Sequence, residues 1–405
     1  MEKLKLGIIG LGQRGYHVTK NELMRMTDNM EIVGVCDVYE DRIEQIQKLV
    51  EEKAGYSPKG TTDYNELLDM GVEAVYIACA WEDHIKIACA AMNKGIYVGL
   101  EVGGAYSIKD CWRLIETYER TRVPVFFLEN CCYGKTELMA KVMVEKGFFG
   151  DVVHCEGSYS HDLRSEVARG NENRHYRLRN YITRNCDNYP THALVPIGKI
   201  LKINDGNRMV SLTSTASCAK GLHEYIVKEF GEEHELSQLE FNQGDVVTTV
   251  IKCANGETIT LRLDTTLPRA YSRNFNVHGT KAAYFEDTNM VFEDGKHNNA
   301  EWDAKKLWDN AKEYEEEYMH PLWKGYDASG GHGGMDFLLF SAFIDYAKRG
   351  AEPPIDVYDT AAYMAITALS EESIAKGSAP VTMPDFTTGM WYQREKKQDD
   401  SKYAL

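Results

Sequence analysis

The sequence predicts an α/β fold, in which a doubly wound parallel sheet is followed by a larger α+β domain. Over residues 1–132, short apolar runs alternate with amphipathic helical stretches, which is the pattern of repeated βα units. Beyond Tyr133, strand-like runs follow one another with few helices between them, which indicates a large, mostly antiparallel open sheet. A chain of 405 residues is long enough for two cores. We therefore expect domains at 1–132 and 133–390 and a tail at 391–405.

The elements of the first domain follow from hydrophobic periodicity and capping residues. The run 74–80 (AVYIACA) is continuously apolar, as expected for a parallel strand that is covered on both faces. Asp63 is a candidate helix N-cap. We expect strands at 5–9, 31–36, 74–80, 96–101 and 123–128, and helices at 16–27, 41–53, 63–70, 83–94 and 108–120.

The second domain is predicted from alternating patterns and one turn signal. Asn255-Gly256 lies between two β-rich runs and predicts a hairpin. The helix at 361–375 is apolar and is expected to pack back on the first domain. We expect strands at 152–159, 210–219, 246–254, 258–264 and 273–277, and helices at 136–146, 303–318, 336–348 and 361–375.

A glycine motif follows the first strand. Gly10-Leu11-Gly12-Gln13-Arg14-Gly15 joins that strand to a helix, and Asp37 ends the next strand. This is the dinucleotide fingerprint of a Rossmann domain. Gly10 allows the tight turn, Gly12 lets the pyrophosphate approach the backbone, and Gly15 lets the helix lie close to the strand. Asp37 would accept hydrogen bonds from a ribose 2′-hydroxyl and repel a 2′-phosphate, which favours NAD over NADP.

Composition excludes several classes of protein. The net charge of −16 argues against nucleic acid or an anionic membrane as a partner. No apolar run approaches the roughly 18 residues of a membrane span, and Met1-Glu2-Lys3 leads into the first strand without a signal peptide. The ten cysteines are scattered, without metal-ligand spacing, and we expect free thiols and a cytoplasmic location.

Polar residues mark two further regions. Trp81–His84, Glu101-Val102 and Glu129-Asn130 follow strands whose carboxyl ends face one crevice, where ligands of such sheets bind. Tyr159 ends a later strand, and four arginines follow between 174 and 184. Tyr189-Pro190-Thr191-His192 opens an apolar helix. A helix N-terminus disfavours the imidazolium, so a neutral His192 can act as a base; packing or capping is the alternative interpretation.

These residues carry a resemblance to the Gfo/Idh/MocA oxidoreductase superfamily and, within it, to glycoside hydrolase family 109. The matching segments are Leu11–Gly15, Trp81–His84, Glu101-Val102, Glu129–Gly134, Tyr189–His192 and Gly331–Asp336. The superfamily's dehydrogenases commonly have Glu-Lys-Pro where this chain has Glu101-Val102-Gly103, and family 109 also lacks that lysine. The departure favours a glycosidase.

The resemblance implies two sets of site residues. The predicted cofactor contacts, together with the fingerprint, are Gly10, Gly12, Gln13, Arg14, Gly15, Asp37, Trp81, Glu82, Asp83, His84, Glu101, Val102 and Asn130. The predicted substrate contacts are Tyr159, Arg177, Tyr189, Thr191, His192, Tyr271 and, in the glycine-rich segment, His332, with Arg179 as the alternative to Arg177. No metal site is predicted.

The resemblance also implies a mechanism. NAD+ would oxidise C3 of the sugar, Tyr159 would remove the C2 proton, and His192 would handle the C3 hydroxyl proton. For this role the pKa of Tyr159 is expected to be lowered, with Arg177 as the candidate partner. The glycosidic group would leave, water would add, and the hydride would return. The implied substrate is an N-acetylgalactosaminide or a related small glycoside. Alternatives are an NAD-dependent C3 sugar dehydrogenase and a non-catalytic sensor of NAD and sugar. A homodimer or homotetramer is expected.

Overall fold

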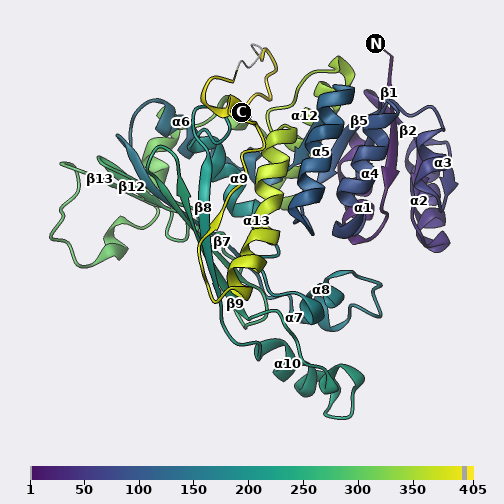
Figure 1. Ribbon diagram of the computed structural model, residues 1–405. Helices are drawn as coiled ribbons and strands as arrows, with labels where there is room; N and C mark the ends of the chain where they lie inside the picture. Colours follow the sequence, from purple (N-terminus) through teal and green to yellow (C-terminus); the bar gives the residue numbers. More distant parts are fainter. Residues whose placement is uncertain (1, 395–398) are drawn as a thin grey trace. The chain divides into compact units, whose positions relative to one another are not determined.

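The computed structural model describes residues 2–394 and 399–405, and its chain divides into two units (Figure 1). The first unit holds residues up to Tyr133, the segment Gly325–Ala362 and the described residues from 399 on. The second unit holds Gly134–Lys324 and the residues from Tyr363 to 394. Residues 395–398 of the expected tail lie outside the described residues.

The first unit is built on a six-stranded sheet in the order β3-β2-β1-β4-β5-β6, in which every neighbouring pair is parallel. β1 pairs with β2 on one side and β4 on the other, so the strand order reverses between β1 and β4. This is the doubly wound order that the sequence predicts. The strands are β1 Leu4–Ile9, β2 Met30–Cys36, β3 Lys59–Thr61, β4 Ala74–Ile77, β5 Tyr97–Glu101 and β6 Val125–Leu128.

The helices of the first unit include one from far along the sequence. On α12, Phe340 packs edge-on against Tyr76 of β4, with ring centroids 5.0 Å apart. Phe343 lies so close to β5 that a Cβ on Gly99 would come within 2.7 Å of its ring. The helices are α1 Gln13–Asn21, α2 Glu40–Ala54, α3 Tyr64–Leu68, α4 Trp81–Asn93, α5 Ile108–Thr121 and α12 Met335–Arg349. The segment 325–362 therefore belongs with the parallel sheet, whereas the sequence pattern placed it in the second domain.

The second unit is built on an eight-stranded sheet in the order β13-β12-β11-β7-β10-β9-β8-β14. All neighbouring pairs are antiparallel except β7 and β10, so the predicted, mostly antiparallel sheet is confirmed. The predicted hairpin at Asn255-Gly256 joins β9 to β10. The strands are β7 Val152–Ser160, β8 Met209–Ala216, β9 Val246–Cys253, β10 Thr258–Asp264, β11 Asn276–Gly279, β12 Ala282–Phe285, β13 Met290–Glu293 and β14 Val381–Thr382.

The helices of the second unit differ from the prediction at one long stretch. The helix expected at 303–318 is instead a series of short turns, because Asp309 adopts φ +62° and interrupts the helical path. The helix at 221–230 was not predicted. The helices are α6 Lys135–Glu145, α7 Arg164–Ala168, α8 Arg177–Thr183, α9 Thr191–Ile200, α10 Gly221–Phe230 and α11 Glu315–Tyr318, and α13 Val357–Ala375 runs from the first unit into the second.

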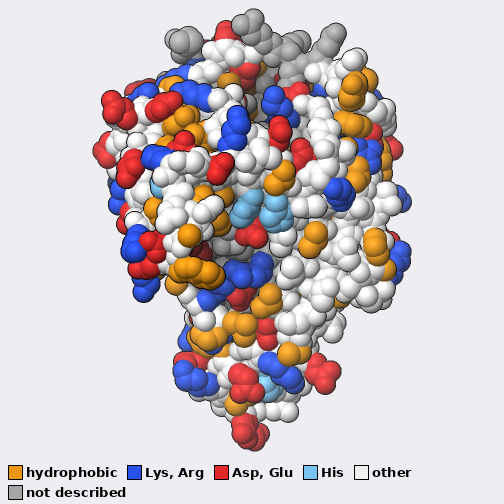
Figure 2. Space-filling model, turned by 90° about the vertical axis from the view of Figure 1, so that its left-hand side faces the viewer, with side chains coloured by type: hydrophobic (Ala, Val, Ile, Leu, Met, Phe, Trp, Pro, Cys, Tyr) orange, Lys and Arg blue, Asp and Glu red, His pale blue; other side chains and the backbone are white. Residues whose placement is uncertain are grey.

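Cysteines and surface charge agree with the composition. All ten cysteines are free thiols, and all but Cys79 and Cys218 are buried. On the face shown in Figure 2, acidic and basic side chains are interspersed and hydrophobic side chains form only small groups. Among the described residues, no helix combines the length and apolar character that crossing a bilayer requires.

Candidate functional site

The three glycines of the fingerprint have different surroundings. Gly10 has φ +93°, and a Cβ there would lie 2.3 Å from the Cys79 amide nitrogen. A Cβ on Gly15 would lie 2.0 Å from the Gly10 carbonyl oxygen. At Gly12 a Cβ would meet only the Arg42 guanidinium, at 3.4 Å. Gly10 and Gly15 are therefore required by packing, whereas a Cβ at Gly12 would make only an ordinary contact with the end of the flexible Arg42 side chain.

The start of α1 directly follows Gly12. α1 begins at Gln13 with Gly12 as its N-cap, and this N-cap residue makes no side-chain hydrogen bond to the first turn. Free N–H groups and the positive end of the helix dipole bind phosphate. The loop therefore fits a dinucleotide pyrophosphate.

Asp37 lies at the end of β2, where it braces the same loop. Its carboxylate accepts hydrogen bonds from the backbone N–H groups of Leu11 at 2.7 Å and Tyr39 at 3.1 Å. The Arg42 guanidinium is 3.7 Å away. A carboxylate has about four acceptor positions, so capacity remains for ribose hydroxyls.

The predicted contacts on α4 and at the end of β5 divide by exposure. Glu82 and Gln13 are exposed, whereas Trp81, Val102 and His84 are buried. His84 Nε2 lies 3.0 Å from the Cys79 carbonyl oxygen, and burial lowers its pKa. A neutral His84 that donates from Nε2 keeps Nδ1 as a buried acceptor, and Nδ1 has no hydrogen-bond partner among the described residues. This orphaned acceptor fits a ligand donor.

Arg14, Glu101 and Asp336 form an ion-pair network within the first unit, in which the two carboxylates are buried and the Arg14 side chain is 30% exposed. Arg14 Nε donates to Glu101 Oε1 at 2.6 Å, and its Nη atoms donate to both oxygens of Asp336 at 2.7 and 3.1 Å. Asn130 donates to Asp336 at 2.8 Å, and His332 Nδ1 lies 2.7 Å from the same carboxylate. Burial alone would raise the pKa of Asp336, but Arg14 and His332 hold it well below its usual range.

The network brings together three predicted cofactor contacts and one predicted substrate contact. Arg14, Asn130 and His332 contact Asp336, and Glu101 joins them through Arg14. Asp336 was not among the predicted site residues. Asp336 is 322 residues from Arg14 in the sequence, so no local pattern signals the contact.

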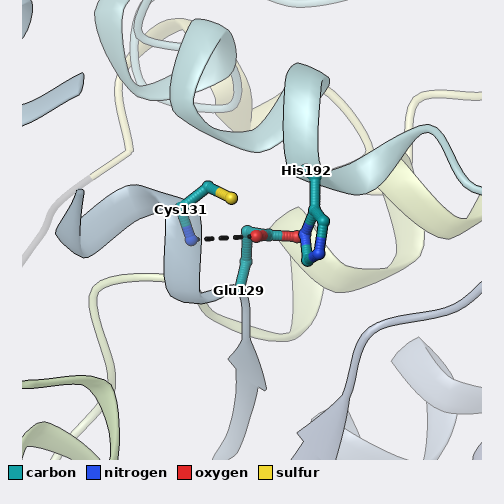
Figure 3. Close-up of side chains that lie close together, drawn as sticks. All are labelled: Glu129, Cys131 and His192. Carbon is teal, nitrogen blue, oxygen red and sulfur yellow. Dashed lines mark hydrogen bonds between the residues drawn. The ribbon is translucent and has the colours of Figure 1, made fainter. Parts of the chain in front are cut away.

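Glu129, directly before Asn130, is fully buried at the end of β6. Its Oε1 accepts a hydrogen bond from the Cys131 backbone N–H at 3.0 Å (Figure 3). The bond holds the chain turn that follows β6 and thereby places Asn130.

In the second unit, Gly157 brings α9 close to β7. A Cβ on Gly157 would lie 2.6 Å from the Ala193 Cβ. Because side chains alternate along a strand, Tyr159 lies on the same face as Gly157. Its ring centroid is 4.4 Å from that of Tyr189 and 5.6 Å from that of His192. His192 projects from the first turn of α9 (Figure 3), with Nε2 3.4 Å from the Tyr189 hydroxyl.

Of the two candidate arginines, Arg177 joins these rings. Arg177 is buried, stacks over Tyr189 with its guanidinium carbon 5.2 Å from the ring centroid, and pairs with Glu166 at 3.0 Å. Arg179 is exposed, with its guanidinium carbon 6.0 Å from the ring centroid of Tyr176. Arg177 is therefore the arginine that lies among these rings, and its contact with a substrate stays a prediction.

Thr191, beside these residues, has a fully buried hydroxyl. Its Oγ1 has no hydrogen-bond partner among the described residues. An unpaired buried hydroxyl is costly, which fits a residue that binds a ligand hydroxyl.

The protonation of Tyr159 differs from the expectation. A catalytic base needs a lowered pKa, but burial raises the pKa of Tyr159 to about 12 and the nearby Arg177 offsets only part of this. The Tyr159 hydroxyl lies 3.2 Å from His161 Nδ1. Burial and Arg177 lower the pKa of His161, so its ring is a neutral acceptor. His161 was missed, although its two-residue spacing from Tyr159 was available in the sequence.

Two predicted substrate contacts are more exposed. Tyr271 is 50% exposed, with its ring centroid 5.2 Å from His161 and 6.4 Å from Tyr159. His332 belongs to the first unit. Its substrate contact stays a prediction.

Comparisons with known proteins match both halves of the chain. Residues 4–128 match the oxidoreductase family with an NAD-binding Rossmann fold, and residues 133–393 match the C-terminal domain of glycosyl hydrolase 109. An α-N-acetylgalactosaminidase of Tannerella forsythia is 37% identical over 97% of this chain and 88% of its own. One of Shewanella oneidensis is 35% identical over 96% and 86%.

Solved structures confirm the fold. A levoglucosan dehydrogenase in complex with NADH and levoglucosan superposes with a TM-score of 0.72 at 18% identity, covering 95% of this chain and 100% of that one. Together with the glycine cradle and the cluster around Tyr159, these matches show that the chain belongs to glycosyl hydrolase family 109 and is a glycoside hydrolase with an NAD-type cofactor domain.

Proposed function

We propose that this protein is a retaining, NAD-dependent glycosidase that hydrolyses α-N-acetylgalactosaminides or closely related glycosides. The observation that carries the proposal is the cluster in the second unit, where the Tyr159 hydroxyl meets the neutral acceptor His161 beside Arg177. This arrangement is built to move a proton. Relatives that are α-N-acetylgalactosaminidases support the choice of sugar.

The cofactor, when bound, supplies reversible oxidation at C3 of the sugar, which acidifies the proton on C2. Tyr159 accepts that proton as its own hydroxyl proton passes to His161 Nδ1, so that no free phenolate has to accumulate, and the positive charge of Arg177 stabilises the negative charge that develops on the Tyr159 oxygen. His192 takes the proton of the C3 hydroxyl. The Tyr189 hydroxyl, 3.4 Å from His192 Nε2, orients the imidazole ring. Thr191 Oγ1 offers a hydrogen bond to a sugar hydroxyl.

NAD rather than NADP is the proposed cofactor. Asp37 has its carboxylate at the end of β2, where it would bind a 2′-hydroxyl and repel a 2′-phosphate. We expect NAD+ to bind at least tenfold more tightly than NADP+. Asp37→Ser should reduce the ratio Kd(NADP+)/Kd(NAD+). Equal affinity of the wild-type protein for both nucleotides would contradict the assignment.

The reaction is tested with α- and β-linked p-nitrophenyl N-acetylgalactosaminide and related glycosides in D2O. Nitrophenol release, deuterium at C2 of the sugar and no accumulation of NADH are expected, because the oxidation is reversed within each turnover. No release, combined with NADH formation from a free sugar and added NAD+, would instead make the protein a C3 dehydrogenase.

The remaining partner assignments rest on the sequence. A small glycoside as the ligand, without nucleic acid or membrane partners, is part of the proposal. The homodimeric or homotetrameric state and the cytoplasmic location stay predictions.

A further inference from the structure

We propose that Asp336 is a positioning residue that sets the preference of the cofactor site for the oxidised nucleotide. It does so by orienting Arg14 and Asn130 and by making the charge of their cluster negative. The inference rests on the cofactor part of the proposed function and does not depend on the glycosidase reaction.

The place of the cluster in the fold indicates which half of the cofactor it serves. Asp37, in the β1–β3 half, is suited to the adenosine ribose. Glu101 ends β5 and Asn130 follows β6, so both belong to the β4–β6 half, beyond the point where the strand order reverses. A dinucleotide binds across that point with one nucleotide on each half. The cluster therefore belongs to the nicotinamide half.

The hydrogen bonds around Asp336 fix the orientation of its neighbours. One Asp336 oxygen accepts a hydrogen bond from Arg14 Nη1. The other oxygen accepts hydrogen bonds from Arg14 Nη2 and from the Asn130 side chain. Glu101 binds the remaining side of the same guanidinium and also accepts from the Tyr76 hydroxyl at 2.9 Å. Arg14 is thereby committed to two carboxylates, so its charge is not available to a phosphate.

The loop before α12 holds Asp336 in place. His332 has φ +50° and lies between glycines, and its side chain is 54% exposed although Nδ1 contacts Asp336. The Gly331 backbone N–H donates to Glu22 at 2.8 Å. A strained backbone of this kind persists only where surrounding contacts enforce it.

The charges of the cluster do not balance. Two carboxylates, Glu101 and Asp336, face one guanidinium, so these three groups together carry one net negative charge. The neighbouring Glu22 and Arg25, 3.6 Å apart, form a separate pair without net charge. The nicotinamide ring is positive when oxidised and neutral when reduced, so a negative cluster in its half of the site favours NAD+. An enzyme whose reaction begins with oxidation needs this resting state.

The test compares affinities for NAD+ and NADH in the absence of any glycoside. Nucleotide-depleted full-length protein at pH 8 is titrated calorimetrically with each nucleotide, for the wild type and Asp336→Asn. Removing one charge within about 10 Å, at an effective dielectric constant of about 20, changes a relative affinity roughly tenfold. We expect Asp336→Asn to weaken NAD+ binding and to lower the ratio Kd(NADH)/Kd(NAD+) by about that factor. If Asp336 had a purely structural role, the substitution would weaken the binding of NAD+ and NADH by the same factor.

A second variant keeps the inference testable if Asp336→Asn folds poorly. His332→Arg adds a permanent positive charge at an exposed position of the same cluster, and we expect the ratio to fall about threefold because solvent screens the charge. His332→Gln is the matched neutral control and should leave the ratio unchanged. Asp345→Asn, on the same helix but paired with Arg349, is the control for a charge change elsewhere on α12.

Ratios within twofold of the wild type in both Asp336→Asn and His332→Arg would overturn the inference. Absence of NAD+ and NADH binding by the wild-type protein would overturn it together with the cofactor assignment. Nucleotide preference that shifts as expected without any glycosidase activity would support the inference and count only against the proposed reaction.

Discussion

Asp336 and Asp187 are both almost fully buried, one in each unit, and their environments shift their pKa values in opposite directions. Arg14 offsets burial at Asp336 and holds its pKa well below the usual range. At Asp187, burial raises the pKa from 3.8 to about 7, and only the backbone N–H of Tyr189 opposes it. No basic side chain of the described residues forms an ion pair with Asp187. A buried charge is therefore fixed where a cation accompanies it and titratable where none does.

The same contrast separates the predicted cofactor contacts around Arg14 from the predicted substrate contacts around Tyr159. In the first unit the polar groups around Arg14 are mutually paired, which fixes geometry and charge. In the second unit, Tyr159 has a raised pKa, and the Thr191 hydroxyl has no hydrogen-bond partner within the described part of the chain, so this region keeps polar capacity for a ligand and for proton transfer.

Removing the proton-transfer hydroxyl is the largest expected effect. Tyr159→Phe keeps the ring contacts with Tyr189 and His192, and we expect kcat to fall about 10³-fold, in the range of general-base catalysis. The melting temperature should change little. Tyr271→Phe removes a hydroxyl from an exposed ring of the same cluster, and it should lower kcat less than tenfold. Full turnover by Tyr159→Phe, measured as nitrophenol release, would place the base elsewhere.

The two aspartates are compared directly by amide substitution. At pH 8, Asp336→Asn should destabilise the protein by about 3 kcal/mol, because it leaves Arg14 with one buried carboxylate fewer. Asp187→Asn should stabilise it, because a buried charge is removed; a shift of three pKa units corresponds to at most roughly 4 kcal/mol. Urea unfolding at pH 8 and pH 5 measures both free energies.

The pH dependence of the two variants follows from the direction of each shift. The pKa of Asp187 is higher in the folded than in the unfolded protein. Its favourable contribution to the free energy of unfolding is therefore complete below pH 3.8 and is lost as the pH rises toward 7. The benefit of Asp187→Asn should therefore shrink at pH 5. The folded pKa of Asp336 is depressed, so its contribution persists at pH 5 and disappears only in strong acid. Destabilisation by Asp187→Asn at pH 8 would contradict the comparison.

The cofactor loop is tested by placing the same methyl group at two glycines. Gly12→Ala meets only the flexible Arg42 side chain, so the fold should be unchanged while NAD+ affinity falls at least tenfold. Gly15→Ala would put Cβ against the Gly10 carbonyl oxygen and should lower both the melting temperature and the affinity. Calorimetric titration and thermal unfolding separate the two effects. Unchanged NAD+ affinity in Gly12→Ala would show that the phosphates do not approach this loop.

Much of this architecture could be predicted because its signals are local. Five of the six strands of the first sheet, the hairpin at Asn255-Gly256 and the Asp63 cap, which accepts from the Asn65 backbone N–H, each follow from a few neighbouring residues, whereas the short strand β3 was not predicted. The start of α9 was predicted from Tyr189–His192, whereas its close contact with β7 at Gly157 was not predicted.

What could not be predicted depends on contacts between distant segments. Nothing local to Asp336 indicates that it binds Arg14, and nothing local to Phe343 indicates that it covers β5. The sign of the Tyr159 pKa shift also escaped prediction, because it depends on how far burial exceeds the effect of Arg177. The charged stretch at 303–318 was assigned as one helix because its composition is helical, whereas Asp309 adopts a left-handed conformation that composition does not reveal.

His161 gives the smallest effect, and that effect tests whether the second unit moves protons. Because the pKa of His161 is lowered, its ring is neutral at pH 7 and gains a proton only below the ordinary range near 6.5. Protonation removes the Nδ1 acceptor of the Tyr159 hydroxyl and adds positive charge beside Arg177, so the wild-type rate should fall as the pH drops below the ordinary histidine range. His161→Asn should reduce kcat roughly tenfold at pH 7. It should also abolish the decrease of the rate at low pH, which is the acid limb of the pH–rate profile. His175→Asn changes a histidine that lies 3.7 Å from Glu166, and it should keep the limb. An unchanged acid limb in His161→Asn would assign the titration, and the proton of Tyr159, to another group.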